Sequence, residues 1–152
     1  MTLYSVQKTK WDQNSPKEMI KTNEQHGRVR IAYALFEAAS TGVNTIEMFN
    51  IPNGARILTC ELVHDAMGSS TTLSIGHAAY VNAAGTVVAL DVDEFKAAAA
   101  STSITTVGGA LTSALGKNMV VDANEVGLPV TVVLAGAAGT GTIELTMTYV
   151  LD

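Results

Sequence analysis

The stretch 142–151 alternates so regularly that it sets the class of fold. Its odd-numbered positions are apolar, and its even-numbered positions up to 148 are Thr or Glu. Side chains alternate faces along a strand, so this pattern predicts a strand whose sheet has one dry face and one wet face. Residues 129–135, rich in β-branched side chains, are expected to pair with it as a hairpin across the glycine-rich turn 136–141. Such a hairpin cannot bury its apolar face alone, so the rest of the chain must supply a second layer.

Similar stretches recur along the chain and predict further strands. Turn sequences such as Pro52-Asn53-Gly54 separate them. The predicted strands are 28–37, 45–51, 55–66, 71–79, 86–90, 103–107 and 118–121. Turns at intervals of roughly 8–12 residues favour an all-β, antiparallel β-sandwich resembling a jelly roll, with a closed barrel as the alternative.

Three of these strands have clear faces. The apolar face of the first is formed by Val29, Ile31, Tyr33 and Leu35, opposite Arg28, Arg30, Ala32 and Ala34. In the third, Leu58, Cys60 and Leu62 share a face opposite Ile57, Thr59, Glu61 and Val63. In the fourth, Leu73 and Ile75 are expected to point inward.

The periodicity changes at 91–100, where one short helix is predicted. Asp91 followed by Glu94 has the spacing of a capping box, and the alanine run 97–100 favours a helix. We expect Val92 and Phe95 to pack this helix against the sheets.

The chain divides at residue 26 into a polar arm, 1–26, and a sandwich domain, 27–152. Residues 1–30 carry six basic and three acidic side chains, and residues 31–152 carry three and eleven, which gives the net charge of −5. Only 15% of the residues are charged, which suggests that other subunits cover part of the surface. The basic excess of the arm is too small to predict nucleic-acid binding, and it fits an acidic partner or a neighbouring copy better.

The arm contains the lone Trp11, which is expected to need a docking site. With Leu3 and Tyr4 it is a candidate anchor on a partner; the alternative is that the arm folds back on its own domain. The candidate partner-binding residues are Leu3, Tyr4, Lys8, Lys10, Trp11, Lys17 and Lys21.

Neither a signal sequence nor a membrane span is expected. The first ten residues lack an apolar core, and no run approaches the roughly 18 apolar residues of a membrane helix. Cys60 is the only cysteine, so no disulfide can form within the chain. We expect synthesis in a cytoplasm and no membrane partner.

No catalytic, metal or cofactor site is expected. His26, His64 and His77 lack metal-ligand spacing, and His64 with Asp65 is interpreted as two surface residues. Helix capping accounts for the acidic stretch 91–94 without calcium. Cys60 alternates with leucines, which indicates a buried apolar role. We therefore expect a protein that is not an enzyme.

Several stretches resemble small structural proteins of tailed bacteriophages. The first is Ile51-Pro52-Asn53-Gly54-Ala55-Arg56-Ile57, and the others are 65–76, 138–142 and 145–149. The resemblance spans roughly residues 28–151. It implies a capsid decoration, or cement, protein that lies on the outer capsid surface of the virion, clamps neighbouring major capsid protein subunits and associates with itself, often as a trimer.

Two further classes remain open. One is another virion component, such as a head fibre base, a neck protein or a tail protein. The other is a carbohydrate-binding sandwich, which usually displays aromatic platforms; the single Trp11 lies outside the sandwich, so this class is the weaker one.

Overall fold

The structure is a computed structural model, and it describes residues 27–107 and 116–151. Ten strands and no helix form within these residues. Their bounds are β1 Arg28–Thr41, β2 Asn44–Ile51, β3 Arg56–His64, β4 Thr72–His77, β5 Tyr80–Val81, β6 Val87–Val88, β7 Asp91–Ala100, β8 Thr105–Val107, β9 Leu128–Ala135 and β10 Gly139–Leu151. No helix in this part of the chain is long and apolar enough to cross a membrane. The seven candidate arm residues lie outside the described residues.

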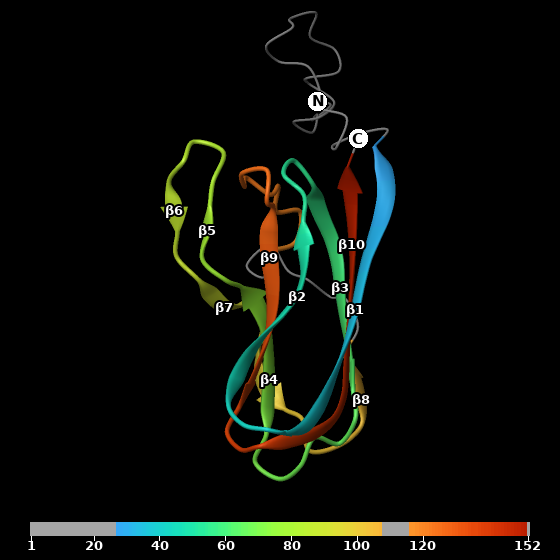
Figure 1. The fold of residues 1–152 in the computed structure, drawn as a ribbon. Helices are drawn as coiled ribbons and strands as arrows, with labels where there is room; N and C mark the ends of the chain where they lie inside the picture. Colours follow the sequence, from blue (N-terminus) through green and yellow to red (C-terminus); the bar gives the residue numbers. More distant parts are fainter. Residues whose placement is uncertain (1–26, 108–115, 152) are drawn as a thin grey trace, which may run out of the picture.

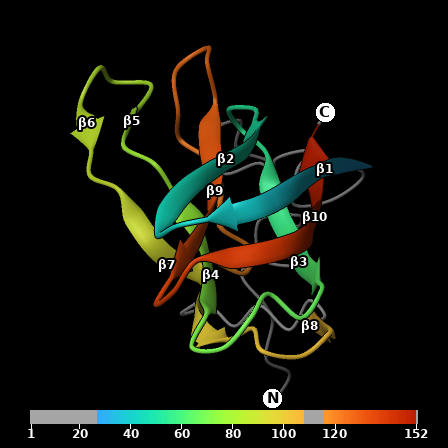
Figure 2. The same cartoon turned by 60° about the horizontal axis from the view of Figure 1, so that its bottom comes forward.

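Eight of the strands form two four-stranded sheets that stack as layers (Figures 1 and 2). The first sheet, sheet A, has the order β1-β10-β3-β8, and the second, sheet B, has the order β2-β9-β4-β7. Every pairing within them is antiparallel. This order is that of a jelly roll into which the small β5–β6 hairpin is inserted, so the all-β sandwich prediction is confirmed.

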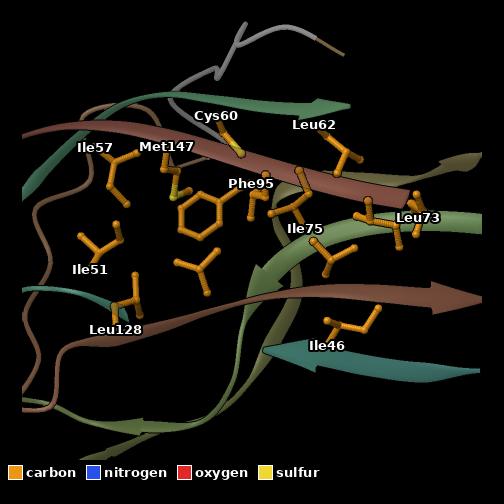
Figure 3. Packing of buried hydrophobic residues seen from close by; sticks show 14 of the residues in the cluster. Ile46, Ile51, Ile57, Cys60, Leu62, Leu73, Ile75, Phe95, Leu128 and Met147 are labelled. Atoms are coloured by element: carbon orange, nitrogen blue, oxygen red, sulfur yellow. The ribbon is translucent and has the colours of Figure 1, made fainter. Parts of the chain in front are cut away.

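The core lies between the inward faces of the two sheets. In β10, Ile143, Leu145 and Met147 are fully buried, as the alternation predicts. Figure 3 shows the Phe95 ring from β7 among Met147, Cys60 and Ile75, so side chains from both sheets meet there. Interdigitation of two apolar faces is what allows each sheet to keep a wet outer surface.

The prediction that 129–135 and 142–151 pair as a hairpin is wrong. β9 lies in sheet B between β2 and β4, whereas β10 lies in sheet A between β1 and β3. The turn between them therefore crosses from one layer to the other. At Gly136, φ is +85°, and a Cβ would meet the Ser70 carbonyl oxygen, so glycine is needed for this crossing.

The apolar face of β1 points away from the core. Residues opposite each other in an antiparallel pair share a face, and β1 places Ala32 opposite Met147 and Ala34 opposite Leu145. Those two large β10 side chains fill the interior, so the alanines lie inward. The bulkier Val29, Ile31, Tyr33 and Leu35 consequently lie on the outer face of sheet A and are exposed.

The prediction of a helix over 91–100 is wrong, because this segment is the edge strand β7. It pairs with β4, with Ala99 opposite Leu73 and Lys96 opposite Ile75. The Asp91 carboxylate accepts a hydrogen bond from the Asp93 N–H at 3.1 Å, two residues on, which is a local turn contact and not a capping box. Pairing with β4 outweighs the helix preference of the alanines, and Phe95 is buried while Val92 remains exposed.

Two local irregularities also depart from the predicted strands. The pairing of β3 with β10 shifts at Leu58, which brings Ile57 into the core and leaves Leu58 only half-buried. The strand predicted over 118–121 is reduced to a single bridge between Val120 and Arg56.

The two faces of sheet A are expected to differ in what they contribute to stability. Leu145→Ala removes a fully buried side chain and should lower the free energy of unfolding by about 2–5 kcal/mol. Ile31→Ala removes an exposed side chain from the same sheet and should cost less than about 1 kcal/mol. Chemical denaturation of both variants measures the difference, and equal losses would contradict the orientation of β1.

Candidate docking surface

The outer face of β1 carries an exposed row of large apolar side chains. Its members, the β1 strip, are Val29, Ile31, Tyr33 and Leu35, and between 54% and 67% of each is exposed. Single exposed apolar residues are ordinary, but a continuous row on one strand is typical of a surface that contacts another molecule.

Polar side chains border the strip on the neighbouring strand. Thr148 lies opposite Ile31, and Thr146 lies opposite Tyr33. The Tyr33 hydroxyl donates a hydrogen bond of 3.1 Å to Glu144 Oε2. Partial loss of water around the phenol, followed by the effect of the Glu144 carboxylate, raises the pKa of Tyr33, so its hydroxyl stays protonated as a donor at neutral pH.

The charged residues of β1 lie on both of its faces. Arg28 and Arg30 are exposed at the beginning of β1. At the other end, Glu37 Oε2 accepts a hydrogen bond of 2.9 Å from the Thr142 hydroxyl. Arg28 lies opposite Leu151 and Arg30 opposite Tyr149, so both arginines share the face of Ala32 and Ala34, whereas Glu37 lies on the face of the strip.

The strip also lies on an edge strand. Among the described residues β1 pairs only with β10, so the backbone on its other side is not taken up by sheet A. An apolar edge strand is a liability for a protein that stays alone in water, because it can pair or pack with another chain. Its presence favours a function in which another protein covers it.

The described residues do not assemble a catalytic centre from His64 and Asp65. His64 is buried, contrary to the expectation of a surface residue, and its Nδ1 lies 2.7 Å from the Asp65 carbonyl oxygen. The Asp65 carboxylate instead accepts a hydrogen bond of 2.9 Å from the Thr142 N–H. The imidazole and the carboxylate are thus held by different partners, as in a structural pair.

No cluster of three metal-ligating side chains is found in 27–107 and 116–151. The acidic residues of 91–94 lie along β7, where neighbouring side chains point to opposite faces. The amide N–H of Asp93, which hydrogen-bonds to Asp91, is the main cause that lowers the pKa of the Asp91 carboxyl. Backbone contacts therefore stabilise this carboxylate without an ion.

A shallow depression of about 330 Å³ lies on the outer side of sheet B near the β5–β6 hairpin. Tyr80, Val126 and Pro129 line it together with Glu47 and Asn50. The Asn50 amide already donates a hydrogen bond of 3.0 Å to the Val126 carbonyl oxygen. His64 and Asp65 are not part of its lining.

Cys60 is 6% exposed and lies in the core, which confirms the prediction of an apolar role. Burial raises the pKa of its thiol to about 12, against a smaller opposite effect of the Lys96 charge. Lys96 Nζ donates hydrogen bonds to the carbonyl oxygens of Leu73 at 3.1 Å and Ala97 at 3.3 Å.

The thiol of Cys60 is expected to resist modification in the folded protein. The raised pKa makes its thiolate fraction near pH 8 about a thousandfold smaller than that of a free thiol. A colourimetric thiol reagent should therefore react slowly with the native protein and rapidly after denaturation. Equal rates in the two states would contradict the buried position.

Sequence reasoning found the residues of the strip but not their role. The signal was present in the small size of Ala32 and Ala34, which alternate with the large residues of β1. Reading it required the register with β10, which places both alanines opposite large buried side chains. Trp11 and the other candidate arm residues were predicted to bind a partner, and they lie outside the described residues.

The fold is similar to that of chains in solved phage capsid structures, among them the following two. One chain of "Cyanophage Pam1 capsid asymmetric unit" is 20% identical, with a TM-score of 0.56, and the match covers 83% of this protein and 86% of that chain. One chain of "Capsid of Ralstonia phage GP4" is 19% identical, with a TM-score of 0.55 and the same coverage. No protein-family model matches the sequence, and no curated protein matches it. The resemblance to phage virion proteins is thus confirmed at the level of the fold.

Proposed function

We propose that this protein decorates and stabilises a bacteriophage capsid by clamping neighbouring major capsid protein subunits on the outer surface of the virion. The observation that carries the proposal is that chains of two phage capsid structures have a similar fold over 83% of this protein. The exposed β1 strip supports the proposal, because such a face is suited to a molecule that functions inside an assembly.

A clamp acts through contact area that is repeated over many copies, and it needs no catalytic chemistry. An interface of about 800 Å² per partner is of standard size, and several weak contacts on one lattice bind together more strongly than each one alone. His64 and Asp65, the one pair weighed for catalysis, are held by different partners. We propose a structural role and not an enzymatic one, which the capsid chains that share the fold support, and we place synthesis in the host cytoplasm before assembly.

The proposal divides the work between two parts of the chain. Residues 1–26 act as an arm that contacts the capsid protein, with Trp11 as its apolar anchor and four lysines for acidic groups. The sandwich, 27–152, contacts further copies of the same protein to form a homo-oligomer.

Shells stripped of this protein test the function. Added wild-type protein should bind saturably over the shell surface and raise the temperature at which the shell opens, measured by electron microscopy and calorimetry. Binding confined to the neck, the tail or a fibre base would support the alternative virion roles. Absence of binding to any part of the particle would contradict the proposal.

Deletion of residues 1–26 is expected to lower shell occupancy by at least tenfold at subsaturating protein. Trp11→Ala should weaken binding by about 2 kcal/mol, roughly 30-fold, as truncation of an aromatic anchor does. Asn14→Ala, a polar change in the same arm, is the matched control and should leave occupancy unchanged. Full occupancy of the shortened chain would remove the arm from the mechanism.

A further inference from the structure

The four edge strands of the sandwich differ in how open they are to a further strand. They are β1 and β8 in sheet A, and β2 and β7 in sheet B. The pairing of β7 with β4 shifts register twice, that of β2 with β9 shifts once, and β8 is described over three residues. In contrast, β1 runs from Arg28 to Ala38 against β10 without a shift, and its middle, 31–36, carries no charge. Bulges and short strands keep an edge from pairing, so within the described residues β1 is the most open edge.

The neighbours of the β1 strip favour a contact along its open side over a contact across the face of sheet A. Thr146 lies opposite Tyr33, Glu144 lies opposite Leu35, and Glu61 of β3 lies opposite Thr146. Stacking the outer faces of two copies would take these carboxylates out of water, which is costly. A strand added beside β1, at the margin of the sheet (Figure 1), leaves both glutamates in water.

We propose that β1 of one copy pairs antiparallel with β1 of a second copy about a two-fold axis at Ala32, so that sheet A continues from one molecule into the next. The inference deepens the proposed function and rests on it for its setting, since it names the surface that joins copies on the shell. The contact forms between two free copies, however, and can be measured without any shell.

A two-fold axis at Ala32 gives every residue of the strip an apolar partner in the second copy. Val29 then lies opposite Leu35, and Ile31 lies opposite Tyr33, each pair occurring twice. Cross-strand pairs of aromatic and β-branched side chains stabilise a sheet. The sequence of β1 is therefore complementary to itself in this register.

The charges of β1 favour the same direction and register. Arg28 and Arg30 lie at the beginning of the strand on its inward face. Antiparallel pairing keeps the arginines of the two copies at opposite ends of the contact, whereas parallel pairing would place like charges side by side. Moving the axis by one residue along the strand would place Val29 opposite Glu37, so the strip would lose an apolar pair.

A second copy is also the occupant that leaves no β1 edge open. A two-fold contact uses the same surface of both molecules and closes, whereas a head-to-tail contact leaves an unused surface at each end. The backbone N–H and C=O groups on the open side of β1 gain partners in the same step. Two four-stranded sheets become one sheet of eight strands, whose outer face carries two strips side by side. This doubles the apolar area that a capsid protein can cover.

Cysteine pairs test the register. An equimolar mixture of Val29→Cys and Leu35→Cys should give mixed disulfide dimers on mild oxidation, and neither variant should do so alone. Ala32→Cys lies on the axis and should cross-link with itself, because residues opposite each other have Cα atoms about 4.5–5.5 Å apart, which a disulfide can span. The native Cys60 is buried and does not interfere. Val126→Cys, at a position 63% exposed outside β1, is the control for random collisions and should stay monomeric.

Glutamate substitutions on adjacent strands distinguish edge pairing from face stacking. Ile31→Glu places a charge inside the contact and should weaken self-association at least tenfold in analytical ultracentrifugation. Thr148→Glu, on β10 directly opposite Ile31, is the matched control and should associate like the wild type. Circular dichroism and thermal unfolding identify a variant that fails to fold, and Ile31→Thr then replaces Ile31→Glu.

Three outcomes would overturn the inference. They are a wild type that stays monomeric at high concentration, a cysteine mixture that forms no mixed dimer, and a Thr148→Glu chain that loses association as fully as Ile31→Glu. The first is the result if residues 1–26 or a capsid protein covers the open side of β1, and the third is the result if two faces stack. Shell binding by the wild type in these cases would leave the proposed function standing. A dimer that binds no part of the particle would remove that function and leave the β1 contact in place.

Discussion

The pairing of β1 with β10 is the constraint on which the rest of the structure depends. β1 places Ala34 opposite the buried Leu145 and Ala32 opposite the buried Met147, so both alanines lie on the inward face. Strand alternation then turns Leu35, Tyr33 and the rest of the β1 strip toward solvent. The same register that completes the core thereby creates the exposed apolar face.

The outward-facing strip changes how the low content of charge is interpreted. A fold with few charged residues and an apolar edge strand has weak protection against association. In a free monomer this combination would be a hazard, but in a lattice of repeated subunits it provides contact area. The proposed function places the protein in the second setting.

The sequence predicted the layers well because strand periodicity is a local property. The inward face of β10, the inward Leu73 and Ile75, and the buried Cys60 all followed from alternation. Pairing partners are not local, which is why β9 and β10 were expected to pair although they belong to different sheets. The prediction of a helix over 91–100 failed for a related reason. Its alanines favour a helix locally, but pairing with β4 makes the segment a strand. Which face of the sheet the β1 strip occupies also depends on the pairing of β1 with β10.

Solvent access to the strip on the particle tests the central claim most directly. Ile31→Cys adds a thiol to a chain whose own Cys60 is buried, so labelling reports on the strip alone. The account predicts rapid labelling of the dilute protein and at least tenfold slower labelling on the assembled particle, with denatured protein setting the full signal. Equal labelling rates in the two states would show that no protein covers this face and would contradict the account.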